Sequence, residues 1–376
     1  MKKILIFYGA YGGGHLAAAT AIKNYLNIYY PDCTVMMVDC VEYINKYLNK
    51  VSTAAYKEMA KKAPWIWKKV YNNSEHGALA KVSSASNKLM SKKLNHVIQE
   101  FNPDLVISTH PFSNQMCTSL KKDKKITCKI ATVLTDMAIH SQWIIDSDYI
   151  DYYFVANHEM KQAMSDSGIA EFKIFVTGIP LSERFKESFD KESICNEFGL
   201  STEKTTVLFF AGGEFGLGRK QTCLVFRALI RLFKDYQIVA ISGKNKKMNS
   251  KFNDLVNTYE VHNRVKVLEY TNKVPELMSI SSIVITKPGG LTTTESLVSG
   301  LPIVIINPIP GQEEENAEFL VRNGLAIWIK KDDNVARALK NLYRNPEIIA
   351  EMKSKALDFA KPDSTKNICD ILMKTI

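Results

Sequence analysis

Long apolar runs are absent from this sequence. No stretch approaches the roughly 18 consecutive apolar residues that a membrane-spanning helix needs, and the opening run KKILIFY gives way to glycines too early for a secretion signal. The seven cysteines form no CxxC pair and no Cys/His spacing typical of zinc ligands. These absences predict a cytoplasmic protein with reduced thiols, without a disulfide framework or a zinc site.

Nucleic-acid-binding modules are also absent, although the formal net charge is +10. Because neither zinc-finger spacing nor an RNP motif occurs, nucleic acid is not expected as a partner. The positive charge is concentrated in residues 56–93, where nine lysines stand against two glutamates. Trp65 and Trp67 beside Lys68 and Lys69 suit the headgroup boundary of an anionic membrane. An equal alternative is a helical subdomain with inward aromatics and solvated lysines.

The length of 376 residues exceeds one ordinary core and predicts two domains. Hydrophobic residues at 46% and charged residues at 23% are typical of a globular chain. We expect an N-terminal domain over 1–183, with a basic and aromatic helical insertion at about 41–100, and a C-terminal domain over 184–355. Residues 356–376 are expected to form a terminal helix that returns to the N-terminal domain.

Runs of strand length recur in both halves, separated by helical or loop stretches. Such alternation predicts α/β domains with parallel, doubly wound sheets. The runs in the first half are residues 2–8, 34–40, 104–110, 129–136, 152–157 and 173–178. Those in the second half lie within residues 205–218, 237–245, 264–270, 282–290 and 301–308.

A glycine turn, GGGH at 12–15, follows the first strand and opens a helix. Backbone amides at such a turn can face a diphosphate or a reacting hydroxyl. In a dehydrogenase, Asp39 after the next strand could hold a ribose, but the spacing here is not GxGxxG. His15 is either a helix-capping residue or, as its place on the turn favours, a functional one.

A second glycine turn, residues 212–216, repeats this device in the other half. Two such turns favour a nucleotide-diphosphate site, although any tight strand-to-helix connection can use glycine. The region that carries most information is residues 286–320. There Thr292 to Thr294 could cap a helix, and Glu295 in its first turn could accept both hydroxyls of a ribose. Beyond Gly311, acid and amide groups suit sugar hydroxyls, or are merely solvated.

Five motifs in order, GGGH, TDxxxHxxW, AGGxxGxG, KPGGLTxxE and PGQExxN, give the chain a specific resemblance. It resembles glycosyltransferase family 28, in particular the monogalactosyldiacylglycerol synthases and the bacterial processive diacylglycerol glucosyltransferases. It is more distantly similar to the transferase that adds N-acetylglucosamine to lipid I. The resemblance covers nearly the whole chain. One departure is Glu214 and Phe215, where a glycine-aspartate sequence is more usual.

The resemblance implies a GT-B fold, with two Rossmann-like domains whose parallel sheets face a central cleft. It implies catalytic roles for His15, Asp136 and His140, and contacts with the acceptor or the membrane by Trp65, Trp67, Lys68, Lys69, His110 and Trp143. The implied UDP-sugar site comprises Gly14, Gly212, Gly213, Glu214, Gly216, Tyr270, Thr271, Gly289, Gly290, Leu291, Thr292, Glu295, Gln312, Glu313 and Asn316.

The reaction that the resemblance implies is an inverting transfer of a hexose from a UDP-sugar to the hydroxyl of diacylglycerol. Either His15 or Asp136 would be the base, and neither a cofactor nor a metal is expected, because the triplet at 146–148 reads as a loop. The enzyme would attach peripherally to the inner face of the cell membrane. Glucose is favoured over galactose, and the alternative is a UDP-sugar transferase or epimerase that acts on another substrate.

Overall fold

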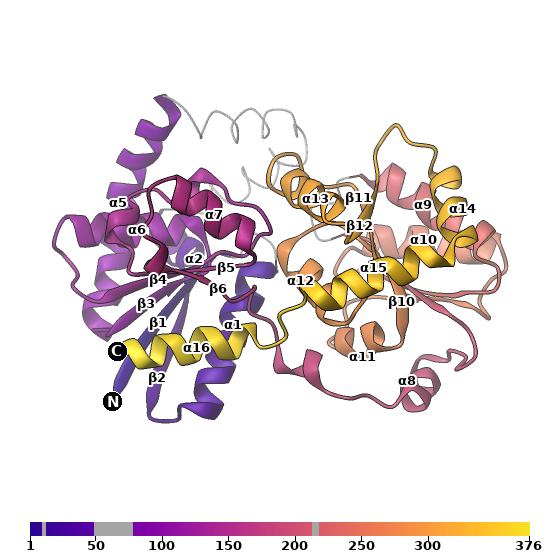
Figure 1. The fold of residues 1–376 in the computed structure, drawn as a ribbon, viewed down its shortest axis with the longest axis horizontal. Coiled ribbons are helices and arrows are strands. Elements are labelled where there is room, and N and C mark those ends of the chain that lie inside the picture. The colour runs from indigo at the N-terminus through magenta and orange to yellow at the C-terminus, as the bar shows by residue number, and fades with distance from the viewer. Residues whose placement is uncertain (10–12, 49–77, 213–217) are drawn as a thin grey trace. The chain divides into compact units, whose positions relative to one another are not determined.

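The computed structural model describes residues 1–9, 13–48, 78–212 and 218–376. These residues form two compact bodies (Figure 1). The first body comprises Met1–Glu183, Pro310–Gln312 and Lys361–Ile376, and the second comprises Arg184–Ile309 and Glu313–Ala360. Most of the basic segment 56–93, with both of its tryptophans, lies outside the described residues.

The sheet of the first body has six parallel strands in the order β2-β1-β3-β4-β5-β6. Ile4 to Phe7 in its second strand are fully buried, as expected for a parallel strand that helices cover on both faces. The strands are β1 (Lys2–Tyr8), β2 (Cys33–Asp39), β3 (Leu105–Ser108), β4 (Lys129–Val133), β5 (Tyr152–Val155) and β6 (Ile174–Val176).

Helices cover both faces of this sheet, and the last helix of the chain, α16, packs against α1 (Figure 1). Ile368 and Leu372 of α16 are buried in one cluster with Ile4 and Leu26, and each buried aliphatic side chain contributes about 1.5–3 kcal/mol. The helices are α1 (Gly14–Tyr29), α2 (Cys40–Leu48), α5 (Ala78–Phe101), α6 (Pro111–Lys122), α7 (His158–Asp166) and α16 (Ser364–Thr375), with the 3-10 turns η1 (Ser141–Trp143), η2 (Ser147–Tyr149) and η3 (Glu171–Lys173).

The sheet of the second body repeats the topology, with six parallel strands in the order β12-β11-β10-β7-β8-β9. Five of these strands, β7 to β11, confirm the runs predicted for the second half of the chain. The sixth, β12, was not predicted, because its four residues are a short run whose two middle side chains are only half-buried. The strands are β7 (Thr206–Phe210), β8 (Gln237–Ile241), β9 (Val265–Leu268), β10 (Ser281–Thr286), β11 (Ile303–Ile306) and β12 (Ala326–Ile329).

The core of the second body is built around aromatic rings. Phe226 and Phe252 stack with their centroids 4.2 Å apart, and Phe209 of β7 meets Phe252 edge-on at 5.5 Å. The helices are α8 (Lys191–Phe198), α9 (Arg219–Leu232), α10 (Lys246–Thr258), α11 (Val274–Ser279), α12 (Gly290–Val298), α13 (Gln312–Arg322), α14 (Val335–Arg344) and α15 (Pro346–Phe359), and the 3-10 turn η4 (Glu183–Lys186) precedes them.

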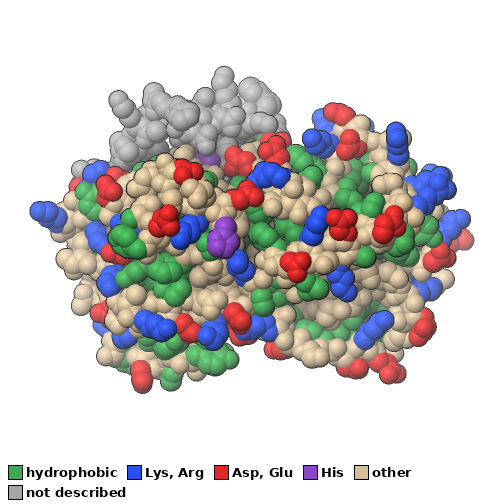
Figure 2. Space-filling view, in the orientation of Figure 1, with side chains coloured by type: hydrophobic (Ala, Val, Ile, Leu, Met, Phe, Trp, Pro, Cys, Tyr) green, Lys and Arg blue, Asp and Glu red, His purple; other side chains and the backbone are tan. Residues whose placement is uncertain are grey.

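On the visible face of each body, basic and acidic side chains are interspersed (Figure 2). The visible face of each body also carries hydrophobic side chains (Figure 2). Among the described residues, no helix is both long enough and apolar enough to cross a bilayer.

Candidate active site

Each sheet has one position where the strand order reverses. In the first body this switch point lies between β1 and β3, since the chain continues from β1 to β2 on one side and from β3 to β4 on the other. In the second body it lies between β7 and β10. Ligands of open α/β sheets bind outside the carboxyl ends of the strands at such points. These two positions therefore define where functional side chains should gather.

His15, the second residue of α1, reaches the switch point of the first body. Its Nδ1 lies 2.6 Å from the carbonyl oxygen of Thr109, just beyond β3, and 3.0 Å from Oγ1 of Thr135. Because a carbonyl oxygen only accepts, the contact assigns the ring proton to Nδ1 and leaves a lone pair on Nε2. His15 is not a helix cap, because α1 begins at Gly14 after Gly13, without a side-chain cap.

Burial keeps this imidazole neutral. It lowers the pKa of His15 to about 4, against the opposing effect of the hydrogen bond to Thr109. The ring of His110 lies edge-on to His15, with 4.6 Å between centroids, and the pKa of His110 is also lowered well below its usual range, by burial and by His15. A Cβ on Gly9 would lie 2.9 Å from the His110 ring, so only glycine fits there. The pair forms an uncharged, tightly packed base site.

The TDMAIHSQW stretch lies beyond β4, and its side chains are largely buried. Asp136 is 5% exposed, and His140 uses its Nδ1 to accept from the backbone N–H of Gln142 at 3.3 Å. Trp143 is 1% exposed, and its carbonyl accepts from Asn114. The indole of Trp143 is thus buried, and its predicted contact with the acceptor or the membrane stays a prediction.

The triplet at 146–148 lies at η2, where Asp146 pairs with Lys122 at 2.8 Å. That ion pair gives Asp146 a partner within its own body.

In the second body, Gly212 follows β7 and Lys287 follows β10, on either side of the switch point. Gly212 has φ +83°, which favours glycine, and a Cβ there would lie 3.1 Å from Cε of Lys287. The three remaining residues of this turn that were predicted to bind UDP-sugar, Gly213, Glu214 and Gly216, lie outside the described residues.

Helix α12 begins directly after the KPGG turn. Gly289 is its N-cap, Gly290 is its first residue, and Leu291 and Thr292 follow in the first turn. The first amides of a helix have no partner within it and attract anions. The expected capping by Thr292 to Thr294 is wrong: these residues lie inside the helix, where Thr294 donates back to the carbonyl of Gly290 at 2.9 Å.

Glu295 does not lie in the first turn of α12, where it was expected, but in the second turn, because the helix begins at Gly290. Its desolvation raises the pKa of the carboxyl to about 8, and no other cause contributes. A carboxyl held in this way near a helix N-terminus is a strong candidate for a ligand contact, because strongly shifted groups gather at functional sites.

Helix α13 carries further predicted residues, of which Gln312 belongs to the first body and Glu313 and Asn316 belong to the second. It opens at Gln312, and Oε2 of Glu313 accepts from the backbone N–H of Ile309 at 2.6 Å. Burial raises the pKa of Glu313, while the Lys287 charge opposes that rise. Asn316 is fully buried and donates to the carbonyl of Pro288 at 3.1 Å, so it joins α13 to the KPGG turn.

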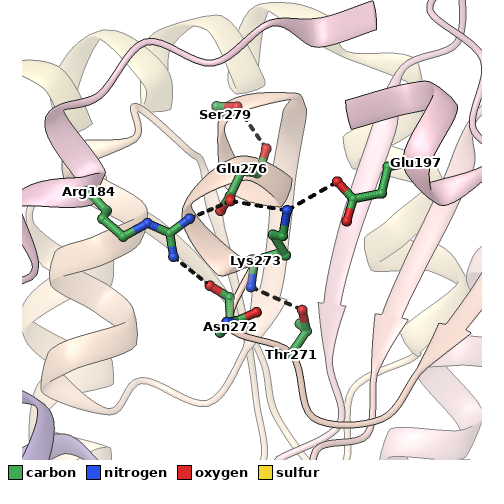
Figure 3. A network of polar contacts seen from close by, with 7 residues as sticks. All are labelled: Arg184, Glu197, Thr271, Asn272, Lys273, Glu276 and Ser279. Carbon is green, nitrogen blue, oxygen red and sulfur yellow. Dashed lines mark hydrogen bonds and ion pairs between the residues drawn. The ribbon is translucent and has the colours of Figure 1, made fainter. Parts of the chain in front are cut away.

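Tyr270 and Thr271, expected beside the uracil, lie in a loop between β9 and α11 that a polar network holds in place. Tyr270 is 72% exposed, and Nζ of Lys244 lies 6.0 Å from the centroid of its ring. Thr271 accepts from the backbone N–H of Lys273 at 3.0 Å (Figure 3). Arg184 donates to the carbonyl of Asn272 at 2.9 Å and pairs with Glu276 of α11 (Figure 3).

Three residues at these positions were not predicted. Thr109 and Thr135 orient His15 through a backbone carbonyl and a hydroxyl; Thr135 opens the TDxxxHxxW motif, whereas the contact of the Thr109 carbonyl has no signal in the sequence. Lys287 is visible in the KPGG motif, and its position directly after a predicted strand could have marked it.

The comparisons with known proteins agree with this geometry. The profile described as Monogalactosyldiacylglycerol (MGDG) synthase matches residues 15–181, and the Glycosyltransferase family 28 C-terminal domain matches residues 217–368. A processive diacylglycerol beta-glucosyltransferase of Bacillus thuringiensis (strain Al Hakam) is 30% identical over 380 residues, covering 99% of this chain and 93% of the relative. Its namesake in Bacillus pumilus (strain SAFR-032) is 29% identical, covering 99% and 95%.

Solved structures share the fold at low identity. The UDP-GlcNAc 2-epimerase from Neisseria meningitidis bound to UDP-GlcNAc gives a TM-score of 0.67 at 16% identity, and it covers 100% of both chains. MurG of Acinetobacter baumannii gives 0.64 at 16% identity with the same coverage.

Two doubly wound parallel sheets define a GT-B fold. Within that class, the identity to its relatives over nearly the whole chain places the protein in glycosyltransferase family 28, with the monogalactosyldiacylglycerol synthases and the diacylglycerol glucosyltransferases.

Proposed function

We propose that this enzyme transfers a hexose from UDP-hexose to the hydroxyl of 1,2-diacylglycerol, with inversion at the anomeric carbon. The names of its relatives support the diacylglycerol acceptor and favour glucose over galactose. The observation that carries the proposal is the neutral imidazole of His15, whose proton sits on Nδ1 and whose Nε2 lone pair is available to a hydroxyl.

The first body supplies the base. Nε2 of His15 takes the proton of the lipid hydroxyl as its oxygen attacks the anomeric carbon, and Thr109 and Thr135 hold the ring in the required tautomer. Asp136 is the alternative base. With either base, one proton leaves the lipid hydroxyl, the bond between the lipid oxygen and the anomeric carbon forms, and the bond between the anomeric carbon and the phosphate oxygen breaks.

The second body binds the donor. The free amides at the start of α12, from Gly290 to Thr292, face the diphosphate. Glu295 accepts hydrogen bonds from the ribose hydroxyls. Gln312, Glu313 and Asn316 are assigned to the hexose, and Tyr270 to the uracil. Because helix amides stabilise the charge that develops on UDP, the proposed reaction uses neither a metal nor a cofactor.

The acceptor resides in a membrane, so the enzyme has to work at its surface. We assign that contact to residues 56–93, with Trp65, Trp67, Lys68 and Lys69, on the inner face of the cell membrane. We expect the enzyme to sediment with anionic vesicles at low salt and to be released from them at high salt. It should not sediment with neutral vesicles.

Mass spectrometry of the lipid tests the function. Incubation with diacylglycerol vesicles and UDP-glucose, with EDTA present, should yield a hexosyl-diacylglycerol, and NMR of the product should give the β-anomer. UDP-galactose in parallel decides the sugar. Absence of glycolipid with both donors would refute the lipid acceptor, whereas recovery of an epimerised UDP-sugar would indicate an epimerase.

A further inference from the structure

The side chain of Lys287 occupies the switch point of the second body, but no role has so far been assigned to it. It follows β10 directly and precedes the N-terminus of α12 by three residues. A Cβ on Gly212, beyond β7, would lie 3.1 Å from Cε, 3.6 Å from Cδ and 3.9 Å from Nζ of this lysine. The absence of a side chain at Gly212 therefore gives the lysine its place between the two strand ends.

The charge of this lysine is only partly balanced within the protein. Glu313 is its electrostatic partner and favours its protonated form, whereas burial lowers the pKa of Lys287. The Glu313 carboxylate is itself engaged by the backbone N–H of Ile309. Within the described part of the chain, Nζ of Lys287 makes no hydrogen bond and no ion pair within 4.0 Å. A secluded ammonium without direct hydrogen-bond partners is costly, unless an anionic ligand provides them.

The surroundings indicate what that anion is. The ammonium belongs to the same turn as the free amides of α12, and a helix N-terminus beside a lysine is a recurring phosphate-binding arrangement. Asn316 fixes the turn by donating to the carbonyl of Pro288, the residue that follows the lysine. The turn is thus built rigidly, with its cation and its amides presented together.

We propose that Nζ of Lys287 binds the diphosphate of the UDP-sugar and stabilises the negative charge that develops on UDP as it leaves. The inference rests on the proposed function. When the bond between the anomeric carbon and the phosphate oxygen breaks, its electron pair stays on that oxygen. Lys287 donates a hydrogen bond and keeps its proton, and Glu313 holds the lysine in its charged form. An interaction that strengthens as charge develops accelerates the chemical step.

The test compares phosphate-bearing and phosphate-free ligands. Lys287→Met should bind UDP about 10- to 100-fold more weakly than the wild type in calorimetry, while uridine affinity stays within about twofold. The kcat for glycolipid formation should fall about 100-fold. Lys287→Arg, which keeps the charge, should restore UDP binding to within about tenfold. Lys251→Met, an exposed lysine of α10, is the matched control and should behave as the wild type.

The outcomes distinguish failure of the Lys287 assignment from failure of the proposed function. If the wild type neither binds UDP nor makes glycolipid, the proposed function fails. If the wild type does both, and Lys287→Met retains UDP affinity and kcat, only the lysine assignment fails. Equal losses for UDP and uridine would show a structural role and also overturn it. Should Lys287→Met not fold, as judged by circular dichroism, Lys287→Gln is measured in the same way.

Discussion

In the first body, the switch point between β1 and β3 holds two neutral imidazoles, His15 and His110. In the second body, the equivalent point between β7 and β10 holds an ammonium, Lys287, and two carboxyl groups, Glu295 and Glu313. At both points burial disfavours the charged form: it lowers the pKa of each histidine and of Lys287, and it raises the pKa of Glu295 and of Glu313. The histidines are therefore uncharged at neutral pH, whereas Glu313 favours the protonated form of Lys287.

The difference matches the two demands of glycosyl transfer. A base must be unprotonated to take a proton from a lipid hydroxyl, and a secluded imidazole is unprotonated at neutral pH. A leaving diphosphate needs amides and a cation. One topology thus serves two tasks through the residues placed at its strand ends.

The largest effect is expected from removing the base. His15→Ala should lower kcat by about 10²- to 10⁴-fold, because general-base catalysis contributes that much, while UDP affinity changes less than about twofold. Steady-state kinetics at saturating lipid, with calorimetry for UDP, measure both. His96→Ala, an exposed histidine of α5, is the control. Full activity of His15→Ala would transfer the base role to Asp136 and break the comparison.

Stability should respond to Glu295 with a characteristic pH dependence. Its folded-state pKa of about 8 exceeds its ordinary value of 4.5, so the folded protein binds the proton more tightly than the unfolded chain. Stability is therefore lost as pH rises from about 4.5 to 8. Glu295→Gln should raise the free energy of unfolding by on the order of 1–3 kcal/mol at pH 9 and by little at pH 4. Denaturant melts at both pH values decide, and an equal effect at both would contradict the burial of a lone carboxyl.

The pH profile of the rate should reflect the secluded imidazole. Since the pKa of His15 is lowered to about 4, the base stays neutral well below the ordinary histidine range. We expect kcat/KM to change less than about twofold between pH 8 and pH 6.5 and to fall only as pH approaches the lowered value. An acid limb centred near pH 6.5 would indicate a solvated base.

The smallest effect is expected in the loop between β9 and α11, which is proposed to lie beside the uracil. Lys273→Ala removes two ion pairs, an exposed one with Glu197 at 3.2 Å, which is worth about 0–1 kcal/mol, and a longer one with Glu276 at 4.0 Å. UDP affinity should stay within about twofold in calorimetry. A larger loss would mean that Lys273 itself, and not only the backbone held by Arg184, contributes to the nucleotide site.

The sequence predicted a large part of this architecture because buried parallel strands are visible in a sequence as short apolar runs. KKILIFY coincides with β1, and the glycine turns mark the strand ends where the site is proposed. Family motifs then located His15 and Glu295. Local pattern failed where tertiary packing decides: Thr292 to Thr294 read as caps but lie inside α12. The environment of Lys287 depends on the proximity of Gly212, 75 positions earlier in the chain, which no local pattern encodes.

The central claim, that the charged switch point binds the nucleotide and the neutral one does not, is tested most directly by titrating UDP into three proteins in a calorimeter. The wild type and His15→Ala should bind UDP with the same affinity, and Glu295→Ala should bind it at least about tenfold more weakly, because the ribose loses its acceptor. No heat of binding to the wild type, or undiminished affinity in Glu295→Ala, would contradict the account.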